Sequence, residues 1–150
     1  MTMLGLLLLL LQTPAIPASQ TVIVGLGDGQ KLVIENPEFS GFIEGRNGAA
    51  VLMYRQQNFH GEMPMSAVSR IEFREYKRGQ PFPMTVTLKN GQKLEVQSER
   101  RDFVTLKGRT QFGSVTINHP DPVSSPVSLS TRKPNRKNDL TIQFLEFPGS

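Results

Sequence analysis

The chain has 150 residues, a formal net charge of +4 and no cysteine. This length predicts a single domain. The missing cysteines exclude disulfides, thiolate metal ligands, thiol nucleophiles and a lipid anchor on an N-terminal cysteine.

The N-terminal stretch has the composition of a secretory signal peptide. Residues 1–18 carry no charged side chain, and residues 4–11 are apolar throughout. This run is too short to cross a bilayer, which takes roughly 20 residues, and the small residues after it are typical of a cleavage site. We expect a signal peptide at residues 1–18, although no lysine or arginine precedes the run. An uncleaved anchor and a buried helix are the alternatives.

Two absences favour a bacterial setting for the exported chain. It has no cysteine and no Asn-x-Ser/Thr sequence. Animal secretions are commonly rich in disulfides, and Asn-x-Ser/Thr marks a surface glycosylation site. We therefore expect a secreted or periplasmic protein that has no stable membrane span after the signal is cleaved.

Residues 19–76 are predicted to form a first β unit. Apolar residues alternate on both sides of Asp28-Gly29, a dipeptide that supplies the positive φ angles of a tight hairpin turn. Strands are expected at residues 21–26, 31–34, 50–54, 61–65 and 70–73. Breaks are expected at Pro37, Gly41 and residues 56–60, and one helical turn at residues 66–68.

Residues 84–122 are predicted to form a second, related unit. The pattern around Asn90-Gly91 repeats that of the first hairpin, and in both copies a phenylalanine and then a Gly-Arg pair follow the turn. Strands are expected at residues 84–89, 92–98, 103–106 and 114–117, with turns over residues 108–113. Residues 77–83 contain one glycine and two prolines and are expected to link the units.

The last part of the chain divides into an arm and a strand. Residues 123–139 are rich in Ser, Pro, Lys and Arg, a composition typical of extended or mobile segments. Residues 140–150 return to apolar alternation. We expect a C-terminal strand that docks on the sheet of its own chain, with exchange into another molecule as the alternative.

Nine or ten short strands without an amphipathic helix predict an all-β fold. The order within the first unit resembles that of the small SH3-like barrels, in which a 3-10 turn precedes the last strand. The resemblance covers residues 21–75 and, more loosely, 84–118, and it implies two related SH3-like barrel or β-sandwich units. Each unit is small, so the two are expected to share one core. The aromatic residues expected in this core are Phe39, Phe42, Tyr54, Phe73, Phe103 and Phe112.

Positive charge is concentrated in the second half of the chain. Residues 19–75 contain five basic and seven acidic side chains, whereas residues 76–150 contain twelve and six. The candidate binding residues are the basic cluster of the arm, which comprises Arg132, Lys133, Arg136 and Lys137. Such a cluster favours contact with an anionic polymer, and a merely solvated connector is the alternative. Nucleic acid is not favoured, because the arm has no aromatic side chain to stack on bases.

The two histidines each precede a carboxylate by two positions. His60 and Glu62, and likewise His119 and Asp121, would share one side of an extended strand. Each pair could serve as a base with its orienting group, or as part of a metal site. No third ligand has a recognisable spacing and no Gly-x-Ser-x-Gly elbow occurs, so we expect no metal, no cofactor and no catalytic residue.

These observations favour an exported, non-enzymatic binding or scaffolding protein. Its partner would be an envelope protein or an anionic polysaccharide. One alternative is a small secreted hydrolase that uses His60 or His119. Another is a structural subunit that assembles by exchange of the C-terminal strand.

Overall fold

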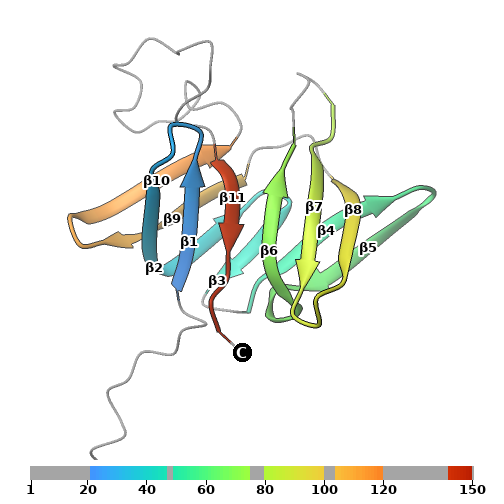
Figure 1. Ribbon diagram of the computed structural model, residues 1–150, viewed down its shortest axis with the longest axis horizontal. Helices are drawn as coiled ribbons and strands as arrows, with labels where there is room; N and C mark the ends of the chain where they lie inside the picture. Colours follow the sequence, from blue (N-terminus) through green and yellow to red (C-terminus); the bar gives the residue numbers. More distant parts are fainter. Residues whose placement is uncertain (1–20, 47–48, 75–79, 100–103, 120–141, 150) are drawn as a thin grey trace, which may run out of the picture.

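The described part of the chain is built almost entirely from β-strands. The computed structural model describes residues 21–46, 49–74, 80–99, 104–119 and 142–149. Within these residues eleven strands pair antiparallel in one sheet, and the helical structure is a single 3-10 turn, η2 (Met65–Ala67) (Figure 1). The all-β expectation is confirmed. The strands are β1 (Thr21–Leu26), β2 (Lys31–Ser40), β3 (Ile43–Arg46), β4 (Val51–Gln56), β5 (Phe59–Pro64), β6 (Val68–Phe73), β7 (Pro83–Leu88), β8 (Lys93–Ser98), β9 (Val104–Thr110), β10 (Gly113–His119) and β11 (Ile142–Glu146).

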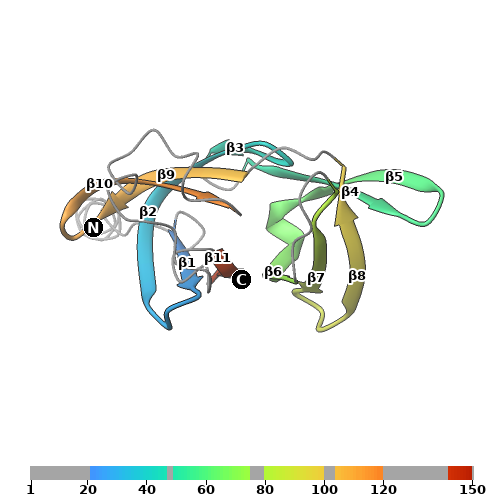
Figure 2. The same cartoon turned by 90° about the horizontal axis from the view of Figure 1, so that it is seen from above.

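Eight of the strands close into an antiparallel barrel. The ring runs β1, β11, β6, β7, β8, β4, β3 and β2, and β2 pairs again with β1. Both predicted units therefore contribute strands to one ring. The remaining strands extend it, because β5 pairs with β4 and the β9–β10 hairpin pairs with β2. Figure 2 shows the β4–β5 and β9–β10 hairpins reaching out at opposite ends of the molecule. We call them the two hairpin arms.

The two predicted Gly turns have matching geometry. Gly29 has a φ of 89° and Gly91 a φ of 90°, values that suit a residue without a Cβ. In each turn the preceding side chain, Asp28 or Asn90, accepts a hydrogen bond of 2.9 Å from the backbone N–H two residues later. The strands also pair in the same register, since Gly25 faces Lys31 and Thr87 faces Lys93. The hairpins β1–β2 and β7–β8 are thus confirmed.

Strand β2 belongs to both the ring and one arm because it bends in the middle. Its first half pairs with β1, and its second half pairs with β3 and β9. The register against β9 shifts between Glu35 and Glu38, where Asn36 has a φ of 51° and Pro37 offers no N–H. Such an irregularity bends a strand and increases its twist. The expectation that Pro37 would end the strand is wrong, because the strand continues beyond it to Ser40.

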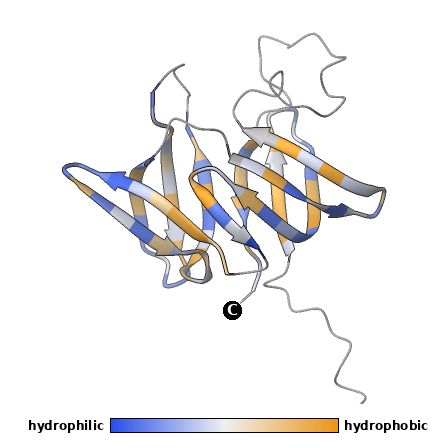
Figure 3. Ribbon diagram, turned by 180° about the vertical axis from the view of Figure 1, so that it is seen from behind, coloured by the Kyte–Doolittle hydropathy of each residue, from blue (hydrophilic) through white to orange (hydrophobic). Residues whose placement is uncertain are grey.

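The interior of the ring is packed with aliphatic and aromatic side chains. Phe42 is fully buried, and its ring lies 6.1 Å from that of Phe73 and 5.3 Å from that of Phe82. Figure 3 shows the strand alternation as orange and blue bands along the ribbons. Of the aromatics expected in the core, Phe39, Phe42 and Phe73 are buried and Tyr54 is partly buried. Phe103 lies outside the described residues.

One aromatic expectation is wrong. Phe112 is 89% exposed, because it sits in the two-residue turn between β9 and β10 at the tip of an arm. Phe82 differs from expectation in the other direction, because it lies in the predicted linker but is only 1% exposed. Its N–H donates to the Ser98 hydroxyl at 2.8 Å. Glycine and proline residues predict a break in regular structure, but they do not show which side chain of the break points into the core.

Strand β11 docks within its own chain, between β1 and β6. Ile142 and Leu145 are fully buried on its inner side. On its outer side the Phe144 ring covers Gly25 and lies 3.9 Å below the guanidinium of Arg70, a cation–π arrangement. Of the two alternatives for the last strand, the structure has intrachain docking. Exchange with a second copy stays a prediction.

Several strand boundaries differ from expectation. Residues 59 and 60 belong to β5 rather than to a loop, and Gly108 to Thr110 continue β9 rather than forming turns. Strand β3 was not predicted, because its four residues include a glycine with a φ of 133°. The predicted signal peptide at 1–18 and the arm at 123–139 lie outside the described residues.

Gly25→Ala is expected to lower the free energy of unfolding by about 1–3 kcal/mol, the usual cost of overpacking. A Cβ on Gly25 would lie 2.0 Å from the Phe144 ring, so the ring would have to shift away from the strand. The same change at exposed Gly27 is the control and should cost less. Urea unfolding of both variants checks this, and equal costs would contradict the proposed Phe144 packing.

Candidate functional site

The basic cluster that sequence analysis selected lies outside the described residues. This applies to Arg132, Lys133, Arg136 and Lys137, and also to Asp121. His119 ends β10, where it pairs with Val104 along the strand ladder. The expected pairing of His119 with Asp121 therefore stays a prediction, as does the role of the basic cluster.

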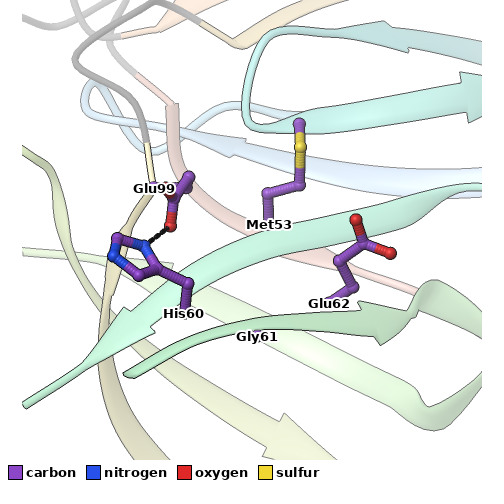
Figure 4. Close-up of a pocket in the computed structure, with 5 residues that line it drawn as sticks. All are labelled: Met53, His60, Gly61, Glu62 and Glu99. Carbon is purple, nitrogen blue, oxygen red and sulfur yellow. Dashed lines mark hydrogen bonds and ion pairs between the residues drawn. The ribbon is translucent and has the colours of Figure 1, made fainter. Parts of the chain in front are cut away.

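His60 lies in a surface pocket on the β4–β5 hairpin, in the second residue pair from the turn. Met53 faces Glu62 and Arg55 faces His60 across the β4–β5 ladder, so these four side chains share one side of the hairpin. The pocket has a volume of about 420 Å³ and is lined by Met53, His60, Gly61, Glu62 and Glu99 (Figure 4).

The carboxylate partner of His60 is Glu99 rather than Glu62. His60 Nδ1 makes a close hydrogen bond with Glu99 Oε2, and in Figure 4 this contact joins the two side chains while Glu62 stands apart. Glu99 is held there because it follows β8, which pairs with β4, and its N–H donates to the Met53 carbonyl at 3.1 Å. The sequence pattern indicated a carboxylate two positions from His60, whereas the carboxylate that bonds to it in the structure is thirty-nine positions away.

A tight contact on the other side of the hairpin fixes the position of His60. The Tyr54 ring lies over Gly61, where a Cβ would be 2.4 Å from the ring. Tyr54 also makes an edge-on contact with Phe59, with ring centroids 6.3 Å apart. Only glycine admits the ring this closely. The Tyr54 ring therefore packs against the backbone next to His60, on the face of the hairpin opposite the His60 side chain.

The pocket offers limited chemistry. A histidine held by a carboxylate can accept or donate a proton, or bind a ligand by hydrogen bonds. The described residues that line the pocket provide no hydroxyl or thiol nucleophile. Across the described residues, no group of three His, Asp or Glu side chains is placed to hold a metal ion. The pocket thus supports proton transfer or polar binding.

A second depression lies on the same outer surface, around β4 and β8. It has a volume of about 530 Å³ and polar walls. Arg74 donates to Glu95 at 2.8 Å, and the Thr85 hydroxyl bonds to both side chains at 3.1 and 3.0 Å. The pattern of the sequence did not single out this group, because its members come from three segments that meet only through the pairing of β7 with β6 and with β8. The depression is lined by Arg55, Gln56, Gln57, Arg74, Pro83, Glu95, Val96 and Gln97.

In comparisons with known proteins, no family model, no curated protein and no solved structure matches this chain. In the portion that the structure describes, no helix has the length and apolar character needed to cross a bilayer. The candidate site is therefore judged on its own geometry.

We expect the ion pair of His60 with Glu99 to add little stability. Both side chains are partly exposed, and exposed pairs contribute at most about 1 kcal/mol. A double-mutant cycle with His60→Ala and Glu99→Gln, followed by urea unfolding, should give a coupling energy below that value. Gly61→Ala should cost more than either, since it displaces Tyr54. The reverse order would show that the ion pair, and not the packing of Tyr54 on Gly61, holds the hairpin.

Proposed function

We propose that the chain is an exported, non-enzymatic binding or scaffolding protein of the bacterial envelope or extracellular space. The observation that carries the proposal is the sheet itself. Its ring is filled with apolar side chains, while two hairpin arms project from it with exposed aromatic residues, Phe59 and Phe112, at their turns. A packed interior supplies rigidity, and projecting elements supply contact area.

Export rests on the sequence. The uncharged, apolar stretch at residues 1–18 and the absence of cysteine and glycosylation sites favour a bacterial secreted or periplasmic chain. The described core is packed from apolar side chains without any disulfide. The proposed domain order is a signal peptide, two β units, a basic arm and a closing strand.

The finer fold proposal is that the two units are related SH3-like modules which share one core. It is supported by the matching register of β1–β2 and β7–β8. It is also supported by the 3-10 turn η2, which directly precedes β6 as it precedes the last strand of SH3-like barrels. The buried side chains of both units belong to one cluster.

The proposed partner is an envelope protein or an anionic polysaccharide. The second half of the chain carries twelve basic and six acidic residues, and four of the basic ones form the basic cluster within residues 123–139. In the described part of that half, Lys89, Lys93, Lys107 and Arg109 are exposed. A positive surface of this kind concentrates polyanions near the protein.

A second function, hydrolysis, is favoured by one observation, which is the orientation of His60 by Glu99 beside a pocket. In this alternative His60 would activate a water molecule as a general base. If the chain is a binding protein, the double variant His60→Ala and His119→Ala should bind the partner as the parent chain does. Neither protein should then turn over glycoside, ester or peptide substrates. A turnover in the parent chain that disappears in the double variant would establish the hydrolase instead.

Neutralising the basic cluster tests the proposed partner. Changing Arg132, Lys133, Arg136 and Lys137 to Gln should weaken retention on an anionic polysaccharide column roughly tenfold at low salt, with a smaller difference at high salt because ions screen the contact. The matched control removes the same charge from four exposed basic residues of the first half, Lys31, Arg46, Arg55 and Arg74. Equal retention of the two variants would contradict a role for the cluster.

A further inference from the structure

Within the described residues, the sheet has two strands with one unpaired edge each. Strand β10 pairs only with β9, and β5 pairs only with β4. By contrast β11, the strand that sequence analysis proposed for exchange, is paired on both sides. An unpaired edge presents N–H and C=O groups to any further strand, so it is the natural place for sheet extension.

The backbone groups that face each open edge follow from the hairpin register. Two-residue turns close both arms, with Gln56 opposite Phe59 and Thr110 opposite Gly113. The two residues that flank such a turn bond to each other through their N–H and C=O groups. The next residue along each strand points these groups away from the hairpin partner, and the two directions then alternate. The bond from Glu99 N–H to the Met53 carbonyl, directed away from β5, agrees with this parity.

The β5 edge is protected against a further strand. Its outward positions are His60, Glu62 and Pro64. Proline has no N–H to donate, and a carboxylate on an edge discourages pairing. Gly61 further weakens the strand as a template. These residues oppose the pairing of a further strand with β5, as charges and prolines do on many sheet edges.

The β10 edge has no proline and no carboxylate, and its one glycine, Gly113, lies at the first position beside the turn. Its outward positions are Ser114, Thr116 and Asn118. From residue 113 to residue 118 the strand contains no proline and no charged side chain, whereas its partner β9 carries Lys107 and Arg109. An uncharged edge of this length is open to a partner strand.

We propose that β10 pairs antiparallel with β10 of a second copy, about a two-fold axis at Thr116. In this register Thr116 faces Thr116 of the second copy, and Ser114 faces Asn118. All three are outward positions, so about six backbone hydrogen bonds form. The interface is isologous and closes as a dimer. The inference goes beyond the proposed function and holds whichever ligand the protein binds.

The same register also matches the apolar side of the strand. Val115 and Ile117 point to one side of β10, where Ile117 is buried and Val115 is partly buried against the core. Pairing about Thr116 places Val115 beside Ile117 of the second copy, so the apolar side continues across the interface. A shift by one residue would set apolar against polar positions. The strand is thus self-complementary in backbone hydrogen bonds and in side-chain pattern, and it has no charges that would repel a second copy.

Sedimentation or light scattering of the full chain from about 1 µM to 1 mM, the range in which weak dimers form, tests the proposal. A dimer is expected in this range. Thr116→Pro removes the outward N–H without touching the β9 ladder and should raise the dissociation constant at least tenfold. Thr116→Ala keeps that N–H and should dimerise like the parent chain. Circular dichroism establishes that each variant is folded.

A charge pairing experiment tests the register without relying on proline. Thr116→Lys alone and Thr116→Glu alone should each be monomeric, because the two-fold axis sets like charges side by side. Mixing the two variants should restore a dimer that contains one chain of each. A parent chain that stays monomeric up to 1 mM, a dimer that Thr116→Pro leaves unchanged, or a mixture that fails to associate would each overturn the proposal.

Discussion

The structure depends on the placement of its last strand between two strands from the first half of the chain. Strand β11 closes the ring by pairing with both β1 and β6. It is held from inside by Ile142 and Leu145 and from outside by Phe144, which lies on Gly25 beneath Arg70. Without it, β1 and β6 would each expose an unpaired edge and the core would open to water. Ring closure and core formation are therefore one event.

This closure binds the two halves of the chain to each other. The closing strand of each half pairs with the leading hairpin of the other, because β6 lies beside β7 and β11 lies beside β1. Aromatic packing also joins the halves, with Phe42 from the first half against Phe82 from the predicted link. Neither half has a complete barrel of its own. The two hairpin arms and the pockets are carried on this shared ring.

Local features were predictable and distant ones were not. Alternation around Gly29 and Gly91 determined both hairpins, because turn geometry and side-chain period act over a few residues. The pairing of His60 with Glu99 needed the β4–β8 contact, which no local pattern encodes. Phe112 was expected in the core because it is aromatic, but it is exposed in the turn that the Gly-rich stretch at 108–113 predicted. The continuation of β2 past Pro37 was missed because a bend can keep a proline within a strand.

The long stretch of sequence between β1 and β11 constrains how the ring forms. The ring cannot close until residue 146 has left the ribosome, so a nascent chain has no finished barrel at any earlier length. Pairings this far apart in sequence also form slowly. We therefore expect the pairing of β11 with β1 and β6, which closes the ring, to be a late step in folding.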